Sequence, residues 1–239
     1  MVHGRPLLLT LLLASCGRLG FDPRAVDAGD DSALDVVDGS AADLTLELHL
    51  TFEGTLDDEA KRRPVGCVGS CPAIASSGTG LVGTFDGSAC LSIASAPELE
   101  TQSFTVAVWF RATSTGVESM FGKPLNGVTS FNNSFELYKT AAGNVIFATP
   151  GFTSTEAGQF TDASWHHAAA TYAGGQIATY LDGVAGAMAS LSTSYAGDAL
   201  LIGCDLDQNT VVAQFVGELD DVRYYSRVLS AVEIAALAQ

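Results

Sequence analysis

Apolar and polar residues alternate with a period of two along much of the chain from residue 44 onward. In L-T-L-E-L-H-L-T-F (residues 44–52) the four leucines fall on one side, with Thr, Glu and His on the other. S-F-T-V-A-V-W-F-R (residues 103–111) repeats the pattern, and its expected buried side holds Phe104, Val106, Val108 and Phe110. A period of two is that of a half-buried β-strand, so both stretches are predicted to be strands.

Further strands are predicted where β-branched and aromatic residues lie between glycine-bearing turns. Asp86-Gly87 and Asp182-Gly183 each lie between apolar alternations, which predicts a tight hairpin at each. So many short strands indicate an all-β, antiparallel sandwich. These strands are residues 84–93, 134–139, 144–149, 165–172, 176–183, 199–203 and 215–225.

One helix is predicted, at the C-terminus. Ser230 and Glu233 have the spacing of a capping box. The expected apolar side of this helix holds Val232, Ile234, Ala235 and Leu237.

The first fifteen residues are predicted to be a signal peptide. Arg5 precedes an apolar run at residues 7–14 that is too short to span a bilayer. The run ends on L-A-S-C, which resembles the bacterial lipobox, in which cleavage precedes a lipid-modified cysteine. That resemblance implies lipid attachment at Cys16 and a place in a bacterial cell envelope, at the outer membrane or cell surface. The alternative is an ordinary signal peptide followed by a half-cystine.

Residues 16–43 are predicted to be a flexible tether. From Ala25 to Asp43 the chain holds six Asp and no basic residue, and neither the strand nor the helix period survives. Such a segment is solvated and self-repelling. The folded domain is therefore expected at residues 44–239.

The charge balance excludes one class of partner. With 27 acidic against 11 basic residues the formal net charge is −16, so the basic footprint that nucleic-acid binding requires is missing. The balance suits divalent cations and neutral or cationic partners.

The remaining four cysteines predict two disulfides, because their number is even and the chain carries an export signal. Four cysteines allow three pairings. Cys67 and Cys71 flank a short loop where a local bridge fits, and a Cys90–Cys204 bridge would join distant strands. A zinc site is the rival reading, but paired C-x-x-C spacing is missing.

Four stretches in order resemble a laminin G-like domain of the concanavalin A-like lectin/glucanase superfamily, in its pentraxin-related form. They are residues 83–93, 103–111, 164–183 and 215–237. The resemblance implies a jelly-roll β-sandwich over nearly all of the chain from Leu44 onward.

The tryptophan and histidine residues of two predicted strands have two possible roles, packing in the core or contacting a ligand. Trp165 is expected to anchor the core, and a platform for a sugar is the alternative. The same two roles are open for Trp109. His166 and His167 are adjacent, so they point to opposite faces of a strand and are poorly placed to share one metal.

The acidic stretch G-E-L-D-D-V-R-Y-Y resembles part of the E-x-D-x-x-E motif of laminarinase-type jelly-roll hydrolases. Glu218 and Asp220 match its first two acids, but Arg223 stands at the third. A guanidinium cannot serve as acid or base near neutral pH, so catalysis is not expected. Arg223 is expected to pair with a neighbouring acid.

Two calcium sites are implied by resemblance to similar sandwiches. The first, structural, joins Asp220 to Asp57 or Asp58 of the first loop. The second, of the pentraxin kind, bridges to a ligand and uses Asn132, Asn133, Asp205 and Asp207. Because calcium accepts carbonyl oxygens, few carboxylates are needed. A polar loop at the rim of the sandwich is the alternative for the second set.

The sequence thus favours a non-catalytic, lipid-anchored surface module that binds extracellular glycan or protein. A hydrolase of a β-glucan and an adhesion protein without a sugar site are the alternatives.

Overall fold

The structure is a computed structural model that describes residues 43–78, 80–125, 133–150 and 153–239. The predicted signal peptide, Cys16, Asn132 and all of the predicted tether except Asp43 lie outside these residues. Within the described residues, no helix has the length and apolar character needed to cross a bilayer. Residues Asp43–Gln239 belong to one folded unit.

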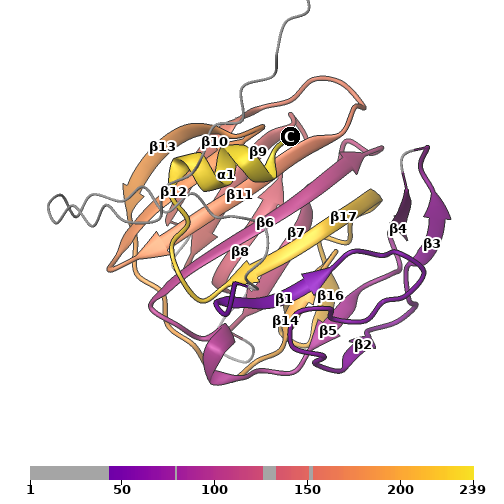
Figure 1. Ribbon diagram of the computed structural model, residues 1–239, viewed down its shortest axis with the longest axis horizontal. Coiled ribbons are helices and arrows are strands. Elements are labelled where there is room, and N and C mark those ends of the chain that lie inside the picture. The colour runs from indigo at the N-terminus through magenta and orange to yellow at the C-terminus, as the bar shows by residue number, and fades with distance from the viewer. Residues whose placement is uncertain (1–42, 79, 126–132, 151–152) are drawn as a thin grey trace, which may run out of the picture. The chain divides into compact units, whose positions relative to one another are not determined.

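The first of two antiparallel sheets has the order β13–β12–β11–β6–β17–β4–β3, with β1 also paired to β17 (Figure 1). We call it the eight-stranded sheet. Its strands are β1 Leu46–Leu50, β3 Ala73–Ser76, β4 Leu81–Asp86, β6 Ser103–Ala112, β11 His166–Ala173, β12 Gln176–Leu181, β13 Val184–Ser190 and β17 Val216–Tyr225.

The second, seven-stranded sheet has the order β10–β9–β8–β7–β14–β5–β2, and a short ribbon, β15–β16, follows β14. Its strands are β2 Val65–Cys67, β5 Leu91–Ile93, β7 Glu118–Pro124, β8 Asn133–Lys139, β9 Asn144–Thr149, β10 Thr153–Gln159 and β14 Leu200–Ile202. The ribbon is β15 Asp205–Asp207 and β16 Thr210–Val212, and a 3-10 turn, η1, spans Pro97–Leu99.

The core lies between the two sheets and confirms the predicted alternation of β6. Phe104, Val106, Val108 and Phe110 are fully buried in one hydrophobic cluster. Phe104 stacks on Tyr224 with ring centroids 5.6 Å apart. The predicted all-β sandwich of jelly-roll type is therefore confirmed.

Helix α1 (Ala231–Leu237) covers the other face of the eight-stranded sheet, as Figure 1 shows. Its capping box is confirmed, with the Ser230 hydroxyl accepting from the Glu233 N–H. Ile234 is buried in a second cluster that includes Ala107, Ala169 and Ala178 of the sheet. Val232 does not belong to the apolar side, since 80% of it is exposed.

One of the two predicted hairpins is wrong. Asp182-Gly183 joins β12 to β13 directly, as predicted. Asp86-Gly87 instead lies where the chain crosses between sheets, because β4 and β5 belong to different ones. Asp86 accepts hydrogen bonds from the backbone and hydroxyl of Ser88, which makes a local turn without strand pairing. The first strand also begins later than predicted, and Leu44 is 80% exposed.

Both disulfides form in the pairing that joins Cys67 to Cys71 and Cys90 to Cys204. Their Cα atoms are 5.2 and 5.5 Å apart, within the usual range. The second bridge links the segment before β5 to the segment after β14, so it holds the start of the β15–β16 ribbon.

Candidate functional site

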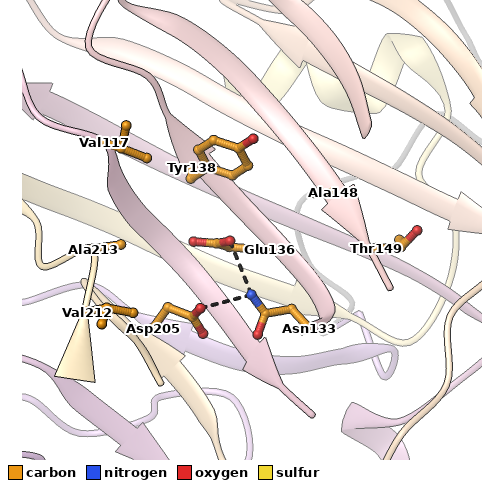
Figure 2. Close-up of a pocket in the computed structure, with 9 residues that line it drawn as sticks. All are labelled: Val117, Asn133, Glu136, Tyr138, Ala148, Thr149, Asp205, Val212 and Ala213. Carbon is orange, nitrogen blue, oxygen red and sulfur yellow. Dashed lines mark hydrogen bonds between the residues drawn. The ribbon is translucent and has the colours of Figure 1, made fainter. Parts of the chain in front are cut away.

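A pocket of about 300 Å³ lies on the outer face of the seven-stranded sheet (Figure 2). Phe135 and Leu137 of β8 point into the core, so the alternate residues Glu136 and Tyr138 face outward. The lining residues are Val117, Asn133, Glu136, Tyr138, Ala148, Thr149, Asp205, Val212 and Ala213.

Two carboxylates converge in this pocket on one amide. Nδ2 of Asn133 donates to Oδ2 of Asp205 at 2.9 Å and to Oε2 of Glu136 at 3.2 Å, as the dashed lines in Figure 2 show. Asn133 and Asp205 are 6% and 4% exposed. Among the described residues, Oδ1 of Asn133 and Oδ1 of Asp205 have no hydrogen-bond partner. The pocket therefore holds buried acceptors that call for a donor or a cation.

The environment disfavours ionisation of both acids. Burial and the nearby charge of Asp205 raise the pKa of Glu136, against hydrogen bonds that lower it. Burial also raises the pKa of Asp205, although the hydrogen bond from Asn133 acts in the opposite direction. Burial and the Glu136 charge raise the pKa of the Tyr138 hydroxyl. A positive charge placed here would reverse these shifts.

The ribbon and a glycine put Asp205 in place. Asp205 follows Cys204 directly, so the Cys90–Cys204 disulfide fixes the start of β15. Gly122 of β7 lies beneath it, and a Cβ there would come within 2.9 Å of the Cys204 carbonyl oxygen. A side chain at Gly122 would therefore displace Asp205 from the pocket.

The structure brings together two of the four residues of the pentraxin-like set, Asn133 and Asp205. Asp207 lies at the far end of β15, half-buried. Glu136 was not predicted as a site residue from the sequence. The feature that could have identified it is a charged residue at an outward position of the predicted strand 134–139, three residues after Asn133.

The first-loop acids are placed differently from one another. Asp58 is fully buried, and Asp57 is exposed. The Asp58 carboxylate accepts from four backbone N–H groups at 3.0–3.2 Å, so its lone pairs organise the loop. These donors belong to His49, Ala60, Lys61 and Arg63.

Asp220 and Asp221 occupy a bulge in β17. The register against β6 shifts between Asp220 and Arg223, and Asp221 has φ +48°. Burial raises the pKa of Asp220 to about 6, with the charges of Asp221 and Glu53 adding to the effect. Oδ1 of Asp221 bonds His49 Nε2 at 2.7 Å and accepts from Arg223 Nε at 2.8 Å, so Arg223 pairs with a neighbouring acid as predicted.

Glu218 lies on the eight-stranded sheet, away from the pocket. Its Oε2 forms an ion pair with Arg111 at 2.6 Å and accepts from the Ser77 hydroxyl. Arg111 also lies over the ring of Trp165, 5.6 Å from its centroid. Trp165 is only half-buried and precedes β11, so the predicted core anchor is wrong.

Trp109 and the two histidines have structural partners. Nε1 of Trp109 donates to the Leu237 carbonyl at 3.0 Å and so holds the end of α1. His167 is buried against Trp109, whereas His166 pairs with Asp182 at 2.9 Å. The opposite orientation of the two histidines agrees with the prediction. In the described part of the chain, no three His, Cys, Asp or Glu residues form a metal-binding group.

The family model for the concanavalin A-like lectin/glucanases superfamily matches residues 85–235. The chain belongs to this family. None of the curated proteins matches the chain.

Solved structures with similar folds share little sequence with the chain. Domain 4 of AbnA, a GH43 extracellular arabinanase from Geobacillus stearothermophilus, in complex with arabinotriose, has a TM-score of 0.65 at 18% identity. That match covers 82% of this chain and 98% of the other.

Two structures of the binding domain of botulinum neurotoxin DC are also similar. The complex with SialylT has a TM-score of 0.60 at 12% identity, covering 81% of this chain and 50% of the other. The complex with rat synaptotagmin II has a TM-score of 0.59 at 11% identity, covering 83% and 52%. The chain thus spans about half the length of these binding domains.

Proposed function

We propose that this protein is a non-catalytic binding module for extracellular glycan. The glycan would lie in the pocket lined by Glu136, Tyr138 and Asp205. The observation that carries the proposal is the pocket itself, which combines aliphatic walls, one aromatic ring and buried acceptors without partners. Its volume suits one or two sugar rings. Two similar folds have been solved with arabinotriose and with SialylT, which supports a glycan, and the synaptotagmin complex makes a protein the second candidate.

A glycan array with the purified chain and an Ala148→Trp variant tests the proposal. The indole would fill the pocket, so every glycan bound by the wild type should be lost. Ala185→Trp, on the exposed strand β13, is the matched control and should bind normally. Glycan binding that survives Ala148→Trp would contradict the proposed site. A flat array together with a specific protein pull-down would favour the adhesion alternative.

The hydrolase alternative has its own test at Glu218. A reducing-sugar assay on β-glucans should show no turnover, because Glu218 is paired with Arg111 and its motif lacks the third acid. Hydrolysis that is lost in Glu218→Gln would overturn the non-catalytic proposal.

We also propose lipid anchoring at Cys16 to the bacterial outer membrane or cell surface, on the strength of the lipobox resemblance. Two or more acyl chains hold a protein firmly, so the protein should sediment with membranes. Cys16→Ser should release it into the soluble fraction. Equal membrane association of the variant would contradict the anchor.

For calcium, we propose a structural ion at the β17 bulge, held by Asp220 with the first loop. Glu53 fits as the loop carboxylate, because its charge is close enough to Asp220 to raise the pKa of that group. The carboxylate oxygens of Asp58 are instead occupied by backbone N–H donors. Two carboxylates suffice where backbone carbonyls complete the shell. Added calcium should raise the Tm by several degrees in the wild type and not in Asp220→Asn. Identical melts with EDTA and with calcium would rule the ion out.

A further inference from the structure

The pocket is short of hydrogen-bond donors and of positive charge. Asn133 already gives its amide N–H groups to Glu136 and Asp205. None of the nine lining residues is basic. Oδ1 of Asn133 and Oδ1 of Asp205 are buried and lack partners among the described residues. The hydroxyls of Tyr138 and Thr149 can donate as well as accept, but an amide or carboxylate oxygen can only accept. A ligand that enters must therefore bring donors to these oxygens, and a positive charge on it would be stabilised by both carboxylates.

An ammonium group meets these needs better than calcium does. Calcium requires six to eight oxygen ligands, whereas four of the nine lining residues are aliphatic: Val117, Ala148, Val212 and Ala213. The Asn133 Nδ2 also lies between the two carboxylates, where a calcium ion would need an oxygen. A primary ammonium carries three donors and no acceptor, which matches a set of surplus acceptors.

The walls of the pocket fit the carbon frame that carries such a group. Tyr138 offers a ring whose face attracts cations and packs against sugar C–H groups. A volume of about 300 Å³ admits a sugar ring together with its substituent. Burial raises the pKa of both Glu136 and Asp205, and a bound cation would relieve this cost.

We infer that the pocket recognises an amino sugar through its protonated amine, held between the carboxylates of Glu136 and Asp205. The inference rests on the proposed glycan-binding function and names the class of sugar. The chain's net charge of −16 works in the same direction, since it draws cationic glycans towards the surface.

Titration calorimetry with two matched probes tests this inference on the full chain. A trimer of β-1,4-linked glucosamine should bind at least tenfold more tightly than the trimer of N-acetylglucosamine. Glu136→Gln and Asp205→Asn keep the shape of each side chain and remove its charge. Each should weaken binding of the amine trimer at least tenfold and leave the acetylated trimer unchanged. Glu218→Gln, an acid on the other sheet, should bind both probes as the wild type does.

Several results would overturn the inference. They are absent binding of the glucosamine trimer to the wild type, equal affinity for both trimers, or unchanged affinity in a folded Glu136→Gln variant. Calcium alone that binds at the pocket and displaces the amine trimer would identify a metal site instead. If Ala148→Trp abolishes binding of neutral glycans while the amine confers no advantage, the proposed function stands and only the amino-sugar inference fails.

Discussion

The outer faces of the two sheets are used in opposite ways. On the eight-stranded sheet, small residues of β6, β11 and β12 let α1 pack close, and Ile234 is fully buried there. On the seven-stranded sheet, the outward residues of β8 include Glu136 and Tyr138, and the surface is hollowed into a pocket. The side chain of Ile234 fills the sheet surface beneath α1, whereas the pocket beside Glu136 leaves space for a ligand.

Close packing on the covered face depends on residues with little side chain. A Cβ at Gly183, in the β12–β13 turn, would lie 3.1 Å from the Cα of Ala235. Gly183 also has φ +75°, which a side chain would strain. The pocket on the open face instead holds polar side chains, and among the described residues Oδ1 of Asn133 and Oδ1 of Asp205 have no hydrogen-bond partner. The contrast is therefore between a surface that a helix packs against and a surface hollowed into a pocket.

The largest effect is expected from the Cys90–Cys204 bridge, which supports the open face. It closes a loop of 114 residues in the unfolded chain. Replacing both cysteines with Ala should lower the free energy of unfolding by about 4 kcal/mol. Denaturant unfolding measures this. The Cys67–Cys71 bridge closes a far shorter loop, so its removal is the control and should cost about 2 kcal/mol. Equal losses would show that loop closure is not the main contribution.

Ile234→Ala should uncover the closed face at a cost of about 3 kcal/mol, since the side chain is fully buried. Val232→Ala, two residues away and 80% exposed, is the matched control and should change stability by less than about 0.5 kcal/mol. Thermal and denaturant unfolding of the two variants test this. Similar losses in both would mean that α1 does not pack as described.

Ser230→Ala removes the cap of α1 and should cost about 1 kcal/mol. The Ser230 hydroxyl accepts from the Glu233 N–H at 3.3 Å, and this N–H would lose its partner. Ser226→Ala serves as a comparison, because its hydroxyl lies outside the helix and bonds Thr45 and Glu47. A melting curve that does not change in Ser230→Ala would rule out a role for the cap in holding the covered face.

Glu136→Gln should stabilise the unliganded protein at pH 7, by about 1 kcal/mol. The folded pKa of Glu136 is raised, so its contribution to stability is fully present below the unfolded pKa and is lost as pH rises through the folded pKa. The gain from Gln should therefore vanish near pH 4. Melting curves across this range test the sign. A variant that is less stable at pH 7 would show that the ionised carboxylate is stabilising.

Strand identity was predictable from the alternation of apolar and polar residues. The alternation of residues 103–111 fixed which side of β6 faces the core, and the structure confirms it. It did not reveal that Thr105 and Ala107 on the opposite side are buried too. Thr105 is hydrogen-bonded to Arg227 and Leu229, and Ala107 packs in one cluster with Leu229 and Ile234. These partners lie about 120 residues later in the chain, so no local pattern reveals the burial.

The pocket was predictable only in part, because its members come from separate strands. Asn133 and Asp205 were candidates by resemblance, whereas Glu136 belongs to the group through its outward position on β8. The predictions for Trp165 and Asp86-Gly87 failed for different reasons. Trp165 lies three residues before Ala168, so the strand period places it on the side opposite the core residues Ala168, Ala170 and Tyr172. An Asp-Gly pair looks the same in sequence whether the chain turns back within a sheet or crosses to another.

The strands, the capped helix and the class of sandwich could be predicted from the amino-acid sequence, because they depend on periodicity and on residues within a few positions of one another. The packing of α1 on the eight-stranded sheet, and the pocket on the other sheet, became known only from the folded chain. The folded chain also brings Glu136 and Asp205 together on a single amide. Those outcomes depend on contacts between residues 72 or more positions apart, whose register is set by packing of the whole sandwich.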